Sequence, residues 1–143
     1  MVVGMVRAGK IVLTVALAAT MLGPAVADFN DSHVFNPDWP PHARFHAVML
    51  LAVGIGVSIA GLWLVWRRSP DPATGLRVAA AVPVVVWGAF FVPLFVPGTS
   101  VEEYPGEVGR LLGVPLNLVL AGVFMVLAVA GYRLSAHGER PSR

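Results

Sequence analysis

The sequence contains no cysteine and few charged residues, and each shortage excludes a class of protein or site. Without cysteine, the chain has no disulfide, no thiolate metal site and no cysteine nucleophile. Charged residues make up only 13% of the 143 positions, whereas a soluble domain usually has about 25%. The few basic residues lie in short flanks beside apolar runs, so the chain has no basic stripe that would bind nucleic acid.

Hydrophobic residues make up 57% of the chain, and mean hydropathy is +0.75. Four apolar runs reach the length of roughly 17 to 25 residues that crosses a bilayer, and none alternates with the period of a barrel strand. We therefore predict an all-α integral membrane bundle of four transmembrane helices, formed by one domain over residues 1–143. The predicted helices cover about residues 9–27, 41–66, 76–96 and 114–134, and a polar cytoplasmic tail follows over 135–143.

The positions of arginine and lysine predict the orientation, because these residues are enriched in cytoplasmic loops. Eight of the ten would lie on the side of the N-terminus, and only Arg44 and Arg110 on the other. We expect a multi-pass protein of the cell membrane with both termini in the cytoplasm and with residues 28–46 and 97–110 outside. On the second outer loop, Glu102 and Glu103 are expected to be solvated or to pair with Arg44 or Arg110.

The first apolar run has a second interpretation, as a cleavable secretory signal. A basic start, an apolar core over 11–22 and Ala25-Val26-Ala27 before Asp28 fit such a signal. The run is also just long enough to span, and its removal would leave three helices that bury less of one another. We favour a retained first helix, and both interpretations give the later helices the same orientation.

Small residues predict where membrane helices pack closely, and prolines predict where a helix is interrupted. We expect seams within the bundle, with dimerisation through the same residues as the alternative. Kinks are expected at Pro83 and Pro93 of the third helix. The predicted seam residues are Ala52, Gly56 and Ala60, with Gly54 and Ser58 beside them, on the second helix, and Gly122 and Ala130 on the fourth.

Residues 31–46, DSHVFNPDWPPHARFH, hold three of the four histidines of the chain at the expected outer boundary. Asn36-Pro37-Asp38 is typical of a turn, and Pro40-Pro41 suits the start of a helix, so we expect Asp38 to be the N-cap of the second helix. Three imidazoles are more than such a cap needs.

His42 and His46 are four residues apart and therefore share one helical face. Three interpretations stay open: a structural or ligand-binding outer cap; an isomerase-like enzyme in which His42, His46 and Asp38 perform acid–base catalysis on a lipophilic substrate; and a metal site of His33, His42 and His46 for zinc or copper. The sequence identifies no cofactor. The expected partners are the lipid bilayer and a lipophilic small molecule or a membrane protein. Candidate ligand-binding residues are His33, Asn36, Trp39, Glu102, Glu103 and Asn117.

The stretch H-x-F-N-P-x-W-x-P-H-A-x-F-H, from His33 to His46, resembles the signature of a family of small bacterial and fungal membrane proteins of unknown function. The resemblance extends over the whole chain, although its specific part is residues 28–46. It implies four membrane helices and supplies no mechanism. Some members carry an acetyltransferase label, but no glycine-rich loop at a helix start is present here to hold the pyrophosphate of coenzyme A.

Overall fold

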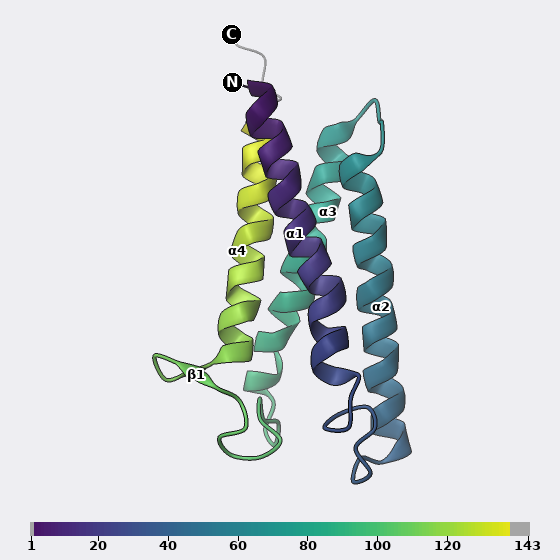
Figure 1. Ribbon diagram of the computed structural model, residues 1–143, viewed down its shortest axis with the longest axis vertical. Helices are drawn as coiled ribbons and strands as arrows, with labels where there is room; N and C mark the ends of the chain where they lie inside the picture. The colour runs from purple at the N-terminus through teal and green to yellow at the C-terminus, as the bar shows by residue number, and fades with distance from the viewer. Residues whose placement is uncertain (1, 138–143) are drawn as a thin grey trace.

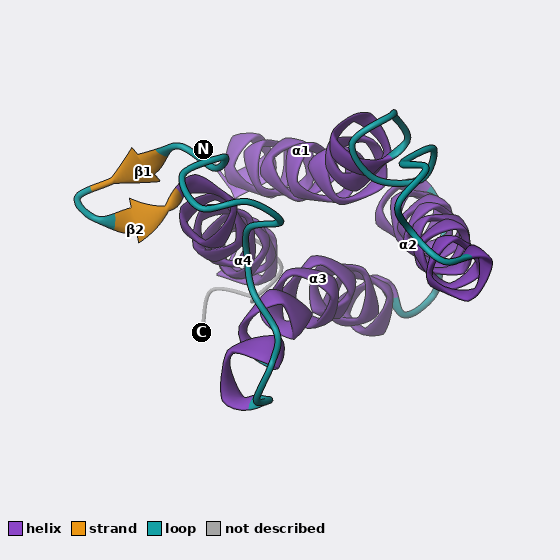
Figure 2. Ribbon diagram, turned by 90° about the horizontal axis from the view of Figure 1, so that it is seen from below, coloured by secondary structure: helices purple, strands orange, loops and turns teal. Residues whose placement is uncertain are grey.

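The computed structural model describes residues 2–137, and within them the chain forms four long helices. They are antiparallel to their neighbours in the chain and form a ring in the order α1, α2, α3, α4 (Figure 1, Figure 2). All four are long and apolar enough to cross a membrane, α3 together with the turns that follow it. The predicted all-α membrane bundle is confirmed. The helices are α1 (Val2–Asp28), α2 (Pro41–Trp66), α3 (Pro72–Gly88) and α4 (Leu116–His137).

The first and last helices extend beyond their predicted ends. α1 begins at Val2 and continues through Pro24 to Asp28. α4 reaches His137, so the first part of the predicted tail is helical and Ser135 is buried. Residues 138–143 of the predicted tail lie outside the described residues.

The start of α2 differs from the prediction in its capping residue. The N-cap is Pro40, with no side-chain hydrogen bond to the first turn, and the helix begins at Pro41. The prediction that Asp38 caps this helix is therefore wrong. The two prolines already fix φ near its helical value, and Pro41 has no amide hydrogen to satisfy.

α3 shows both a capped start and an interrupted end. The carboxylate of Asp71 accepts a hydrogen bond from the amide of Thr74 at 3.1 Å, and hydrogen bonding with Thr74 holds the pKa of Asp71 below its usual value. Pro83 is buried inside the helix. Before Pro93 the α-helix ends, and two 3-10 turns follow, η1 (Ala89–Phe91) and η2 (Pro93–Phe95). The expected interruption at Pro93 thus takes the form of a tighter helix.

A short β-hairpin, which the sequence analysis did not predict, precedes α4. Strand β1 (Arg110–Leu111) pairs antiparallel with β2 (Val114–Pro115). Leu112 and Gly113 between them have positive φ angles of 51° and 83°, which suits a two-residue hairpin turn.

α1 supplies much of the buried core. Leu13, Ala16 and Leu17 are completely buried and belong to one cluster with Leu76 and Ala79 of α3. α1 also packs against α2 and α4, and its contact with α4 is the most extensive between any two described helices. The first helix is therefore a structural member of the bundle.

Two glycines allow the backbones of α1 and α4 to meet. A Cβ atom added at Gly131 would lie 2.8 Å from the backbone nitrogen of Leu13 and 3.0 Å from the carbonyl oxygen of Gly9. One added at Gly9 would lie 2.7 Å from the carbonyl oxygen of Gly131. Close backbone approach through small residues is a main source of helix association in a bilayer. Lipid tails are as apolar as the side chains, so an apolar side chain gains little by moving from lipid into a contact between helices.

Most of the residues predicted to lie in contacts between helices do not lie there. Ala52, Gly56 and Ala60 of α2 are all exposed, and a Cβ added at Gly122 of α4 would meet open space. The prediction that these residues pack within the bundle is wrong. On α2 the buried positions are Leu51, Ser58, Gly61 and Val65, of which only Ser58 was among the expected residues.

Hydrogen bonds between side chains also join α1 to its neighbours. The indole of Trp87 in α3 donates to the buried hydroxyl of Thr20 at 2.8 Å. The indole of Trp66 at the end of α2 donates to the hydroxyl of Thr14 at 3.0 Å. Such bonds contribute on average about 0.6 kcal/mol each in a membrane protein, so they specify the arrangement more than they stabilise it.

Replacement of Gly131 by alanine tests the contact between α1 and α4. We expect Gly131→Ala to destabilise the bundle by about 1 to 3 kcal/mol, because the added methyl group forces two backbones apart. The matched control is Gly122→Ala on the same helix, where the methyl group enters open space. Thermal unfolding followed by circular dichroism in one detergent measures both variants, and equal stabilities would contradict the assigned packing.

Candidate functional site

Two connecting segments lie at the same end of the bundle, opposite the start of α1 and the end of α4 (Figure 1). We call residues 29–40, between α1 and α2, together with residues 97–109, before the hairpin, the cap. The cap holds most of the residues that the sequence analysis singled out. Its internal hydrogen bonds show which of these side chains are already engaged by the fold.

Asn30 closes the end of α1. Its side-chain nitrogen donates to the carbonyl of Ala27 at 2.7 Å. Its side-chain oxygen accepts from the amide of Ser32 at 2.9 Å and from the hydroxyl of Ser32 at 2.7 Å. Asparagine commonly ends helices in this way, because its short amide can satisfy a free carbonyl and bond the following backbone.

Ser32, His33 and Asp28 follow one another in space as the serine, histidine and aspartate of a catalytic triad do. The hydroxyl oxygen of Ser32 lies 2.8 Å from Nδ1 of His33, and Nε2 of His33 lies 4.0 Å from the carboxylate of Asp28. The single hydroxyl proton of Ser32 is donated to Asn30, so Nδ1 of His33 donates to Ser32 and does not accept from it. This geometry positions the loop and leaves Ser32 without a base.

Asn36 joins the two parts of the cap. Its side chain is only 6% exposed; the amide nitrogen donates to Oε1 of Glu103 at 2.9 Å, and the amide oxygen accepts from the backbone of Asp38 at 2.9 Å. Trp39 donates its indole N–H to the same oxygen of Glu103 at 3.1 Å. Three predicted ligand-binding residues are thus bonded to one another.

Other predicted residues also hold the loops. Arg44 donates to the carbonyl of Asn36 at 2.7 Å and to that of Pro37 at 3.2 Å. Glu102 pairs with Arg110, which was one of its two expected partners. Asn117 donates to the carbonyl of Val101 at 3.1 Å, so it faces the cap from the first turn of α4.

The three histidines form two separate groups. His42 and His46 are exposed, and their Nε2 atoms lie 3.0 Å apart, so one ring donates a proton to the other. The ring of His33 lies near Asp28 and makes an edge contact with Trp39, with 5.6 Å between ring centroids. Within residues 2–137, no three side chains of His, Asp or Glu come together in a way that could hold a metal ion.

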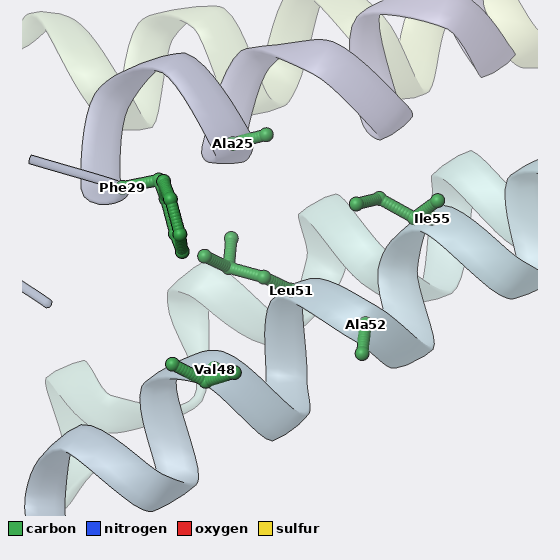
Figure 3. A pocket seen from close by; sticks show the side chains of 6 residues that line it. All are labelled: Ala25, Phe29, Val48, Leu51, Ala52 and Ile55. Carbon is green, nitrogen blue, oxygen red and sulfur yellow. The ribbon is translucent and has the colours of Figure 1, made fainter.

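An apolar groove lies between the end of α1 and the cap half of α2 (Figure 3). Its volume is about 360 Å³. The sequence analysis missed it, because its lining residues are ordinary members of apolar runs and the space depends on how far the two helices separate. The lining consists of Ala25 from the last turn of α1, Phe29 directly after that helix, and Val48, Leu51, Ala52 and Ile55 from α2.

The groove and the histidine pair lie on different faces of α2. With 3.6 residues per turn, positions 48, 51, 52 and 55 share one face, and positions 42 and 46 lie roughly opposite to it. Neither histidine lines the groove. An apolar molecule held there would therefore not be presented to His42 or His46.

Replacement of Glu103 tests whether this side chain holds the cap together. Glu103→Ala removes the acceptor shared by Asn36 and Trp39, so we expect local opening of the cap to become about 1 kcal/mol easier, or roughly fivefold more frequent. Glu103→Gln, the matched control, keeps an amide oxygen that can accept both bonds. Hydrogen exchange of residues 29–40 measures the difference, and identical exchange in the two variants would contradict this role.

Comparison with known proteins identifies a family. No curated protein and no solved structure matches the chain. Residues 11–139 match a family described as a family of unknown function, DUF6640. The match covers α1 from residue 11 onward, the other three helices and the cap, and it agrees with the expected membership of an uncharacterised family. The chain therefore belongs to the DUF6640 family of unknown function.

Proposed function

We propose that this membrane protein binds a lipid-soluble molecule, with its apolar part in the groove and its polar part beside the cap. The observation that carries the proposal is the groove itself. All six side chains that line it are apolar, and a volume of about 360 Å³ falls within the range of roughly 300 to 1,000 Å³ for ligand sites.

The position of the groove supports entry from the membrane. It lies between two neighbouring helices, so its opening is at the side of the bundle (Figure 3). Phe29 is 57% exposed although it lines the groove. Its ring also makes an edge contact with Phe35 of the cap, at 5.0 Å between centroids. A molecule that lies in the bilayer can therefore reach the groove without crossing water.

We further propose that the cap faces the outside of the cell and that α1 is retained. The distribution of arginine and lysine supports the orientation. Retention is supported by the core positions of Leu13 and Leu17 and by the closeness of Gly9 to α4. In addition, Ala25 of α1 lines the groove, so cleavage before Asp28 would remove this residue from the groove and leave Phe29 without the helix that positions it.

Binding has better support than catalysis. An acid–base mechanism by His42, His46 and Asp38 requires these groups to face the substrate, yet the histidine pair lies on another face of α2. Among the described residues, the one carboxylate within ion-pair distance of an imidazole is Asp28, which faces His33. Both the enzyme alternative and the metal alternative would need the histidines and the cap to adopt a different arrangement, in which the proposed groups come together.

A cross-linking experiment tests the groove. The protein is reconstituted in nanodiscs of phosphatidylcholine that contain a phosphatidylcholine with a diazirine in one acyl chain, and the sites of photolabelling are mapped by mass spectrometry. We expect labels to concentrate on the groove residues, relative to the other membrane-facing surfaces. Ala52→Phe should reduce groove labelling by about tenfold, which corresponds to a loss of about 1.4 kcal/mol of binding free energy.

The control variant is Ala60→Phe, which places the same side chain two turns further along α2 at an exposed position outside the groove. It should leave groove labelling unchanged. Uniform labelling around the bundle, or an equal effect of the two substitutions, would contradict the proposed binding site.

A further inference from the structure

The hairpin, residues 110–115, carries apolar side chains away from the rest of the chain. Figure 1 and Figure 2 show it projecting sideways from the bundle beside the first turn of α4. Leu112 at its tip is 97% exposed, and Leu111 and Val114 are about half exposed. Leu112 therefore gains almost no burial from the protein itself, and Leu111 and Val114 are only partly buried by it.

The backbone of Leu112 makes its exposure more informative. Its φ of 51° lies in the left-handed region, where glycine, asparagine and aspartate are the usual residues and a bulky side chain is an outlier. Gly113 beside it, with φ of 83°, is the expected residue for such a turn. The chain therefore has a large apolar side chain where the backbone disfavours it and where the fold makes no use of it.

The hairpin is held at the depth where α4 begins. β2 ends at Pro115, and the membrane-spanning length of α4 starts at the next residue, Leu116. The amide of Leu116 donates to the carbonyl of Gly109 at 2.8 Å, which closes the base of the hairpin. This connection keeps the hairpin beside the start of the membrane-spanning length of α4.

The charged residue at the base of the hairpin is paired with a residue of the cap. Arg110 pairs with Glu102 and also donates to the carbonyl of Gly113 at 3.2 Å. The apolar tip therefore projects without an unpaired cation beside it. An apolar tip at a membrane boundary is suited to the region of lipid headgroups and upper acyl chains.

We propose that the hairpin inserts Leu112, together with Leu111 and Val114, into the lipid leaflet at the cap end of the bundle. The insertion fixes how deep residues 97–109 of the cap lie in the membrane, because the ion pair of Glu102 with Arg110 connects this segment directly to the hairpin. This interaction surface is separate from the groove between α1 and α2, so the proposal of membrane insertion does not depend on the proposed ligand site.

The absence of cysteine allows a direct test. Leu112→Cys in the full chain is labelled with the fluorophore NBD and reconstituted in phosphatidylcholine vesicles. We expect blue-shifted emission and strong quenching by phosphatidylcholine that carries a nitroxide on the upper part of its acyl chain. The control is Asp31→Cys at an exposed position of the cap, where the label should emit as in water and be quenched weakly.

Two results would overturn the proposal. One is a label at position 112 that behaves like the label at position 31. The other is a blue shift at position 112 that disappears when each nanodisc holds one copy of the chain, since the tip would then contact a second copy and not lipid.

A second variant separates insertion from folding. Leu112→Asn suits the left-handed turn, so circular dichroism should show an unchanged bundle. An NBD label at Val114→Cys in this background should shift its emission toward that of water, compared with the same label beside Leu112. An unchanged emission in a folded protein would show that Leu112 does not anchor the hairpin.

Discussion

The close approach of α1 and α4 at Gly9 and Gly131 is the contact on which the rest of the arrangement depends. In lipid, apolar side chains are as well solvated outside the bundle as inside, so helix association relies on close packing and a few hydrogen bonds. The crossing places the start of α1 against α4, while the other end of α1 lies beside α2 (Figure 1, Figure 2). The groove lies where α1 and α2 approach each other near the cap, so its shape depends on the tilt that the glycines permit.

The cap illustrates why residues typical of chemistry can have structural roles. Asn36 is almost fully buried, and a buried amide must find partners for both its donors and its acceptor. Glu103, Trp39 and Arg44 bond to Asn36 or to one another, and in doing so they join the two loops. What remains outside this network is the apolar groove and the exposed histidine pair, on different faces of α2. This separation favours binding over catalysis as the proposed function.

The fold could be predicted from the sequence because a bilayer allows few structures, and four apolar runs of sufficient length leave the helical bundle as the simple solution. The surfaces through which the helices pack against one another could not be predicted from the sequence. Ala52, Gly56 and Ala60 have the same spacing as a true packing surface, and only the position of the neighbouring helices shows that they are not buried in a helix contact. The ion pair of Glu102 with Arg110 was among the expected alternatives. The groove and the hairpin were missed, because the first depends on helix separation and the second on a leucine in an unusual turn position.

The central claim is that α1 is a permanent part of the bundle, and that the core and the proposed ligand groove are incomplete without it. The mass of the intact protein, purified from the membrane of cells that produce it, tests this claim most directly. The account predicts a chain of about 15.1 kDa that retains the N-terminal helix. A product that begins at Asp28 and is nevertheless folded and stable would contradict it.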